Sequence, residues 1–254
     1  MSNISLAVQM YTLRNEQAKD FAGTIKEIAR IGYSGVELAG YGNLKSARDV
    51  KKALDDAGLK VCGGHWIIEQ LETELPKILD ENEVLGNKTI VCPWMPEERR
   101  QSADAWRKTA AALTRIGGEC QKRGFTFCYH HHSFEFARFD AKSGMDILIE
   151  SSDPKLVKLE LDTYWLAHGG EDPAAFINRV GNRVALLHVK DMADGPEQRF
   201  APVGAGKLKF GPILQAAAKA GVKWAIVEQD NCYDTPPIEA VRMSFRNLQK
   251  LAGA

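Results

Sequence analysis

Strand-like and helix-like segments alternate along the whole chain, and this alternation constrains the fold more than any other feature. Eight short apolar runs are predicted to be strands, at residues 5–11, 35–38, 60–64, 89–93, 126–130, 159–162, 185–189 and 225–228. Segments with helical periodicity lie between or after them, at residues 21–31, 46–57, 71–85, 102–123, 173–180, 210–220 and 236–251. Strict βα alternation is typical of one parallel sheet, because parallel strands need long helical connections.

Chain length and the first loop indicate how this sheet closes. The 254 residues suit one (β/α)8 TIM barrel, which typically takes about 250 residues. An open doubly wound sheet usually carries a glycine-rich phosphate loop after its first strand. Here Thr12–Asn15 follow that strand, without a G-x-G-x-x-G motif. The sequence therefore predicts the α/β class and a single TIM barrel domain over residues 1–254.

Charge and composition narrow the classes of function. Lys and Arg number 33, as do Asp and Glu, so the formal net charge is zero. Proteins that bind nucleic acid or anionic membranes usually show a basic patch, and no Lys/Arg cluster stands out here. No apolar run reaches the roughly 20 residues of a membrane span, and the first residues do not resemble a signal peptide. We therefore expect a cytoplasmic protein that binds neither nucleic acid nor membrane; a homo-oligomer is compatible with this composition.

Ionisable side chains stand at the ends of four predicted strands. Asp162, His188 and Glu228 each follow an apolar run, and His130 ends the strand at 126–130. The carboxyl ends of barrel strands share one mouth, so these side chains should converge there. Imidazole and carboxylate together suit one divalent ion such as Mn²⁺, Co²⁺, Zn²⁺ or Mg²⁺. The sequence thus predicts these four residues as metal ligands, with Glu135 as the alternative to His130.

Three consecutive histidines end the fifth predicted strand. Side chains alternate along a strand, so His130 and His132 should face one side and His131 the other. Neutral imidazoles can act as bases near pH 7, and we predict His132 as a catalytic residue together with Glu228. The residues predicted to contact the substrate are His65, Trp94, Glu135 and Trp165.

Lys190 is the third predicted catalytic residue. It lies two residues after His188, so strand alternation puts both side chains on one face. Its ammonium would stabilise negative charge on a substrate oxygen. An ion pair with Asp191 or another carboxylate at the mouth is the alternative.

Two further alternatives concern loops. Asp162 would be a helix N-cap instead of a metal ligand if a helix followed it, but none is predicted there. The glycine-rich segment 202–208 precedes a predicted helix and is either a phosphate-binding loop or a tight turn.

Five motifs carry a resemblance to a known family. They are Tyr129–Phe136, Leu161–Trp165, Leu187–Asp191, Val203–Gly206 and Val227–Asp230. Around them nearly the whole chain resembles the xylose isomerase-like TIM barrel superfamily, and within it the sugar phosphate isomerase/epimerase family and its inosose dehydratase-like branch. Members of that family hold one divalent ion with Glu, Asp, His and Glu from four strands. Asp162, His188 and Glu228 match three of these positions, and His130 stands about where the first Glu is expected.

The resemblance implies an enzyme that enolises a small-molecule keto-sugar or keto-cyclitol with a divalent ion. Return of the proton to carbon would make it an isomerase or epimerase, and loss of a β-hydroxyl or glycosidic oxygen would make it a dehydratase or lyase. The histidine in place of the first Glu slightly favours the second outcome. The rivals are a metal-dependent hydrolase of the endonuclease type on the same barrel, which the neutral charge disfavours, and a non-catalytic sugar-binding protein, which would not need converging ionisable groups.

Overall fold

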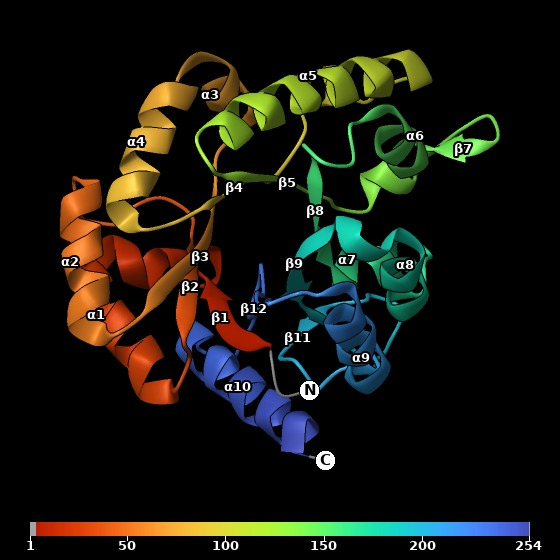
Figure 1. The fold of residues 1–254 in the computed structure, drawn as a ribbon. Coiled ribbons are helices and arrows are strands. Elements are labelled where there is room, and N and C mark those ends of the chain that lie inside the picture. Colours follow the sequence, from red (N-terminus) through yellow and green to blue (C-terminus); the bar gives the residue numbers. More distant parts are fainter. Residues whose placement is uncertain (1–3, 254) are drawn as a thin grey trace.

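A closed barrel of eight parallel strands forms the centre of the molecule (Figure 1). The structure is a computed structural model that describes residues 4–253. Around the barrel the strands follow the order β1-β12-β9-β8-β5-β4-β3-β2. Their bounds are Ser5–Gln9 (β1), Gly35–Leu38 (β2), Lys60–His65 (β3), Thr89–Cys92 (β4), Thr126–His130 (β5), Lys158–Asp162 (β8), Val184–Val189 (β9) and Trp224–Val227 (β12). The predicted TIM barrel is confirmed.

Helices surround this barrel (Figure 1). They are Arg14–Ile31 (α1), Ala47–Ala57 (α2), Ile68–Thr73 (α3), Leu75–Leu85 (α4), Ala103–Lys122 (α5), Gly144–Ser151 (α6), Thr163–His168 (α7), Pro173–Val180 (α8), Phe210–Ala220 (α9) and Pro237–Gly253 (α10). α10 lies beside α1, where Arg242 Nη2 donates to Glu27 Oε1 at 2.6 Å, and β12 pairs with β1, so the two ends of the chain close the ring. Among the helices of residues 4–253, none is both long enough and apolar enough to cross a membrane.

The first strand is shorter and the first helix longer than predicted. β1 ends at Gln9, whose side-chain oxygen accepts a hydrogen bond from the Tyr11 N–H at 3.1 Å and caps a 3₁₀ turn, Met10–Leu13. α1 then begins at Arg14 and is kinked at Asp20, where φ is −153° and ψ is 90°. Because the kink interrupts the helical periodicity, the sequence pattern indicated only the part after it.

Two helices that the sequence did not predict flank β8. α6 begins with a capping box between Ser143 and Asp146. α7 starts directly after β8, and Asp162 is its N-cap, because Oδ1 accepts a hydrogen bond from the Trp165 N–H at 2.9 Å. The expectation that no helix follows Asp162 was therefore wrong. α7 has 6 residues, which is too short for helical periodicity to show in the sequence.

Interior side chains of the barrel change from apolar to polar along the strands. The apolar interior cluster contains Ala7, Cys62, Val91, Cys128, Leu186 and Ile226. Four polar side chains stand two residues after members of this cluster and therefore also point inward: Gln9, His130, His188 and Glu228. Strand alternation therefore places a polar layer above the apolar one, at the carboxyl ends of the strands.

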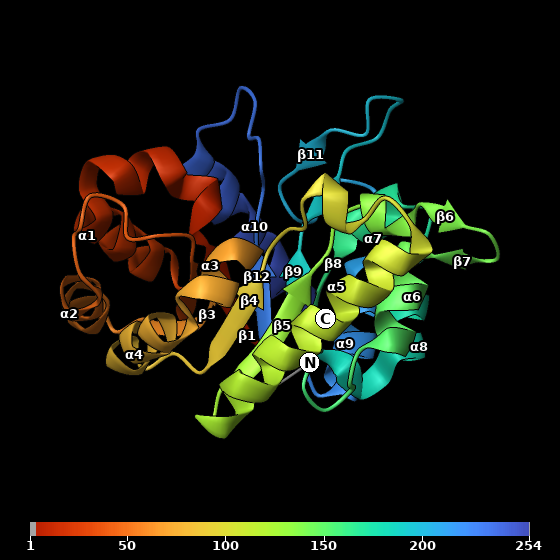
Figure 2. The same ribbon diagram turned by 90° about the horizontal axis from the view of Figure 1, so that it is seen from above.

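Two connections extend the barrel at this end (Figure 2). One carries a small antiparallel hairpin, Asp191–Met192 (β10) paired with Phe200–Ala201 (β11). The other joins β12 to α10. One follows β9, which carries His188, and the other begins with Glu228, so both border the polar layer at the mouth of the barrel.

Candidate metal centre and substrate cavity

The four predicted metal ligands meet at the mouth of the barrel. His130, Asp162, His188 and Glu228 each offer one ligand atom, and these atoms all lie within 4.8 Å of one another. The strand register explains part of this, since Asp162 is the direct partner of His188 in the β8–β9 pair. His188 Nδ1 lies 2.9 Å from Glu228 Oε2 and 3.9 Å from Asp162 Oδ2. All four residues are buried.

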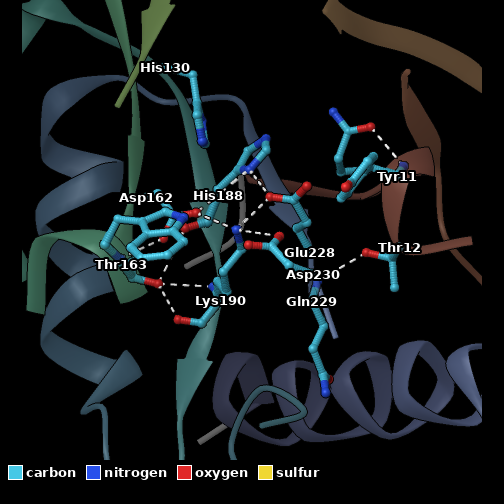
Figure 3. A network of polar contacts seen from close by, with 12 residues as sticks. Tyr11, Thr12, His130, Asp162, Thr163, His188, Lys190, Glu228, Gln229 and Asp230 are labelled. Carbon is cyan, nitrogen blue, oxygen red and sulfur yellow. Dashed lines mark hydrogen bonds and ion pairs between the residues drawn. The ribbon is translucent and has the colours of Figure 1, made fainter. Parts of the chain in front are cut away.

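The ammonium of Lys190 lies among three carboxylates (Figure 3). Its Nζ is 3.0 Å from Asp162 Oδ2, 2.7 Å from Glu228 Oε2 and 2.9 Å from Asp230 Oδ1. Burial lowers the pKa of Lys190, but the three carboxylates outweigh burial and raise this pKa well above its ordinary value. With only 1% of its surface exposed, Lys190 is placed to hold the carboxylates and not to line a cavity.

Asp191 does not form the ion pair with Lys190 that its place in the sequence suggested. Its carboxylate accepts hydrogen bonds from the backbone N–H groups of Gly204, Gly206 and Leu208, at 2.9, 2.9 and 3.1 Å. A Cβ atom on Gly206 would lie 2.5 Å from Asp191 Oδ1, so close approach requires glycine there. The amides of the glycine-rich segment thus bind a carboxylate of the protein itself, and the tight turn is the better description of this loop.

A second ionisable group, which the sequence analysis missed, adjoins the first. Glu37 and Glu160 are fully buried. His65 Nε2 lies 3.2 Å from Glu37 Oε2 and 3.0 Å from Glu160 Oε2, and Gln9 Nε2 donates to Glu37 Oε2 at 2.8 Å. Glu160 stands two residues before Asp162, so strand alternation could have indicated its inward direction.

These two carboxylates face ring nitrogens of the histidines in the first group. His188 Nε2 lies 2.7 Å from Glu37 Oε2, and His130 Nδ1 lies 3.0 Å from Glu160 Oε2. A carboxylate beside one ring nitrogen fixes the orientation and tautomer of a metal-binding histidine. Glu37 therefore leaves Nδ1 of His188, the atom near Glu228, available for an ion.

The balance of charge at the mouth fits a divalent cation. The mouth contains one ammonium, which contacts the carboxylates of Asp162, Glu228 and Asp230, while the carboxylates of Glu37 and Glu160 contact histidines. Buried carboxylates without a countercharge are costly. Asp162 Oδ2 and Glu160 Oε1 are buried and have no aligned hydrogen-bond donor. A divalent ion fits two sets of converging ligand atoms here, the four predicted residues and the adjoining Glu37, His65, Glu160 and His188. Their imidazole and carboxylate donors suit Mn²⁺, Co²⁺ or Zn²⁺.

A cavity of about 410 Å³ opens at this centre. Its wall consists of Tyr11, Ala39, His65, Ile67, Gln70, Pro93, Trp94, His130, His132, Glu228 and Asp230. Four residues predicted to act on or contact the substrate are therefore on the wall: His65, Trp94, His132 and Glu228. Since His130 and Glu228 belong both to the wall and to the metal-binding group, a molecule in the cavity would lie next to a bound ion.

Glu135 and Trp165, also predicted to contact substrate, lie behind the wall. The Tyr129 hydroxyl donates to Glu135 Oε1 at 2.6 Å, and the His132 N–H donates to Oε2 at 2.9 Å. Burial raises the pKa of Glu135 to about 7. The Trp165 ring packs against the His132 ring, with 5.1 Å between centroids. Both residues contact His132 and not the cavity.

His131 points away from the cavity, as strand alternation predicts. Its Nε2 accepts a hydrogen bond from the Asp162 N–H at 3.1 Å, and its ring is fully buried. The central histidine of the three therefore supports the backbone of a metal-ligand residue, while His130 and His132 line the cavity.

Two wall residues differ in their suitability for proton transfer. Burial, reinforced by the charge of Lys190, lowers the pKa of His132 to about 3, so this imidazole is neutral but weakly basic. Burial raises the pKa of Asp230 to about 6, closer to the value that suits a base at neutral pH. The sequence analysis assigned no role to Asp230, although it stands two residues after Glu228.

The comparison with protein families agrees with this architecture. The model of the xylose isomerase-like TIM barrel matches residues 25–251. The chain belongs to the xylose isomerase-like TIM barrel family. Among its curated relatives, inosose dehydratase of Lacticaseibacillus casei is 27% identical over 248 residues, which cover 83% of this chain and 82% of that protein. Inosose dehydratase of Clostridium perfringens strain 13 is 27% identical over 267 residues, with coverage of 93% and 84%.

Solved structures of the xylose isomerase-like family share the fold. A sugar phosphate isomerase/epimerase from Parabacteroides distasonis superposes with a TM-score of 0.84 at 24% identity, over 98% of this chain and 94% of that one. The IolI protein, solved with a bound zinc atom, superposes with a TM-score of 0.77 at 16% identity, over 98% of both chains. At these identities the likeness shows the fold alone.

Glu37→Gln is expected to weaken metal binding by about 10- to 100-fold, the usual cost of losing a carboxylate that orients a histidine ligand. A glutamine oxygen would still accept the His188 hydrogen bond, but without the charge that favours it. Competition against a chelating dye would measure the affinity. Glu74→Gln, at an exposed glutamate, is the matched control. Equal affinity in the Glu37 variant and the wild type would show that Glu37 does not orient the ligand.

Proposed function

We propose that the chain is a metal-dependent enzyme that enolises a keto-sugar or keto-cyclitol and then eliminates a hydroxyl group or a glycosidic oxygen from the β-carbon. The observation that carries this proposal is the position of the metal-binding group in the wall of a cavity. His130 and Glu228 belong to both, and the wall also contains His132 and Asp230. The similarity to inosose dehydratases supports the same type of reaction.

The four ligands would hold the ion where a substrate oxygen can reach it. A divalent ion in this position polarises a carbonyl group and stabilises negative charge on its oxygen. Asp162 contributes Oδ2, because its Oδ1 is engaged as the cap of α7. Lys190 is a positioning residue in this proposal, since its ammonium fixes Asp162, Glu228 and Asp230 from behind the wall.

Asp230 is the best placed base for the carbon next to the carbonyl. It lies on the wall, and its carboxylate is held by one hydrogen bond from Lys190 Nζ at 2.9 Å. Of the other acidic and imidazole side chains of the wall, His130 and Glu228 are proposed ligands, and His65 contacts the buried carboxylates of Glu37 and Glu160. Only His132 has neither role. We propose that Asp230 takes the α-proton and, once protonated, returns it to the departing β-oxygen, so that this group leaves as water or an alcohol. His132 would hydrogen-bond a substrate hydroxyl, as a weakly basic imidazole can.

Two observations favour elimination over epimerisation: the histidine at the first ligand position and the similarity to proteins named as dehydratases. Family members that hold their ion with two glutamates have a carboxylate at the first ligand position, where this chain has His130. A symmetric proton transfer between two such carboxylates is therefore not available here. The curated relatives at 27% identity are named as dehydratases.

The substrate is proposed to be unphosphorylated. The described part of the wall contains two carboxylates and neither lysine nor arginine. A phosphate group would be repelled there, and the backbone amides that could have bound one are occupied by Asp191. The same lack of basic groups disfavours a hydrolase that acts on nucleic acid.

Incubation with inososes and keto-sugars and added Mn²⁺ in D₂O, followed by NMR, tests the proposal. We expect exchange of the α-hydrogen and formation of an unsaturated product. Asp230→Asn should slow both by about 10²- to 10⁴-fold, the typical contribution of a positioned base, whereas the exposed Asp234→Asn should not. Sugar binding without exchange or elimination would instead favour a non-catalytic sugar-binding protein.

A further inference from the structure

Exposed apolar side chains gather on one wall of the cavity. Among the described residues, the large apolar side chains with high exposure are Tyr11 (45%), Ile67 (46%), Val84 (40%), Trp94 (43%), Tyr233 (43%) and Met243 (40%). Three of them, Tyr11, Ile67 and Trp94, line the same cavity. They come from the turn after β1, the residue before α3 and the loop after β4, so the fold and not the local sequence brings them together.

Exposed apolar surface in a cavity indicates a ligand with an apolar part. The metal-binding and proton-transfer residues account for the polar side of this cavity. Tyr11, Ile67, Pro93 and Trp94 supply most of the rest of the wall, together with Ala39 and Gln70. A second sugar ring would need several hydrogen-bonding partners for its hydroxyl groups, whereas the polar side-chain groups among these residues are the Tyr11 hydroxyl and the Gln70 amide.

We propose that Tyr11, Ile67 and Trp94 form a subsite for a neutral aromatic or apolar group attached to the sugar. The keto-sugar of the proposed reaction would then carry an apolar aglycone as a glycoside. The identity of the reacting ring rests on the proposed function, but the subsite itself does not. No lysine or arginine lines the described wall, although the Arg14 guanidinium lies 4.4 Å from the centroid of the Tyr11 ring. The apolar surface favours an uncharged aglycone.

Calorimetric titration of the Mn²⁺-loaded protein with methyl and phenyl β-glucoside tests this subsite, because the two ligands differ only in the aglycone. Each aromatic contact typically contributes a factor of roughly two to ten in affinity. We therefore expect phenyl glucoside to bind about tenfold more tightly or better. Trp94→Ala and Tyr11→Ala should each reduce that ratio towards one.

Val84→Ala and Met243→Ala are matched controls, since both remove an apolar side chain of similar exposure outside the cavity wall. They should leave the ratio unchanged. Equal or undetectable binding of the two glucosides would overturn the subsite, as would a ratio that survives Trp94→Ala. A dimer that Trp94→Ala dissociates would also overturn it, because a second copy of the chain would then cover this wall.

The result of this titration tests the subsite independently of the proposed reaction. A preference for phenyl glucoside without α-hydrogen exchange on any keto-sugar would support the subsite and contradict the enolisation. Exchange on free inososes with equal binding of the two glucosides would support the enolisation and contradict the subsite.

Discussion

His188→Ala is expected to abolish stoichiometric binding of a divalent ion and, with it, turnover. His188 is fully buried, and its two ring nitrogens face the two ionisable groups: Nδ1 faces Glu228 and Nε2 faces Glu37. Its removal would leave three ligands for the ion and would separate Glu37 from the site. Because a metal ion contributes several kcal/mol of transition-state stabilisation, activity should fall by at least about 10³-fold.

Elemental analysis after gel filtration measures the bound metal, and circular dichroism checks that the variant folds. His168→Ala is the matched control, because His168 is an exposed histidine at the end of α7. If the His188 variant retained one ion per chain, the assigned ligand set would be wrong. If the control also lost its metal, the loss could not be attributed to the site.

Lys190→Met is expected to destabilise the metal-free protein by about 3–5 kcal/mol, the usual cost of removing one partner from a buried charge cluster. The substitution leaves Asp162, Glu228 and Asp230 without their shared cation. Saturating Mn²⁺ should restore part of this loss, because the ion would neutralise Asp162 and Glu228. The position of Lys190 in the sequence suggested instead a group that acts on substrate and could be replaced without loss of stability.

Urea denaturation with and without Mn²⁺ measures these free energies. Lys209→Met, at an exposed lysine before α9, should change the free energy of unfolding by less than about 0.5 kcal/mol. An unchanged stability of the Lys190 variant would show that the carboxylates are neutralised by protons and do not need the ammonium. Equal destabilisation with and without Mn²⁺ would show that the ion does not share these carboxylates.

The barrel and the convergence of three candidate metal ligands could be predicted from local sequence patterns. An apolar run defines a buried strand, and the ionisable residue that ends it lies at the carboxyl end. Asp162, His188 and Glu228 follow this pattern, and the closed sheet brings them together because all eight strands are parallel. The alternation of His130, His131 and His132 was equally predictable, since it depends only on the geometry of one strand.

The partners of Glu37, Glu160 and Lys190 could not be named in this way, because they come from other strands. Glu37 is separated by 151 residues from His188, which it orients. Asp191, which sequence proximity suggested as a partner for Lys190, instead binds the backbone of a later loop. The sequence by itself indicated that Asp162, His188 and Glu228 reach the mouth of the barrel. Only the tertiary structure decided which ionisable side chains pair with one another. Electrostatic and hydrogen-bond energies depend on distances between side chains, and no local pattern contains these distances.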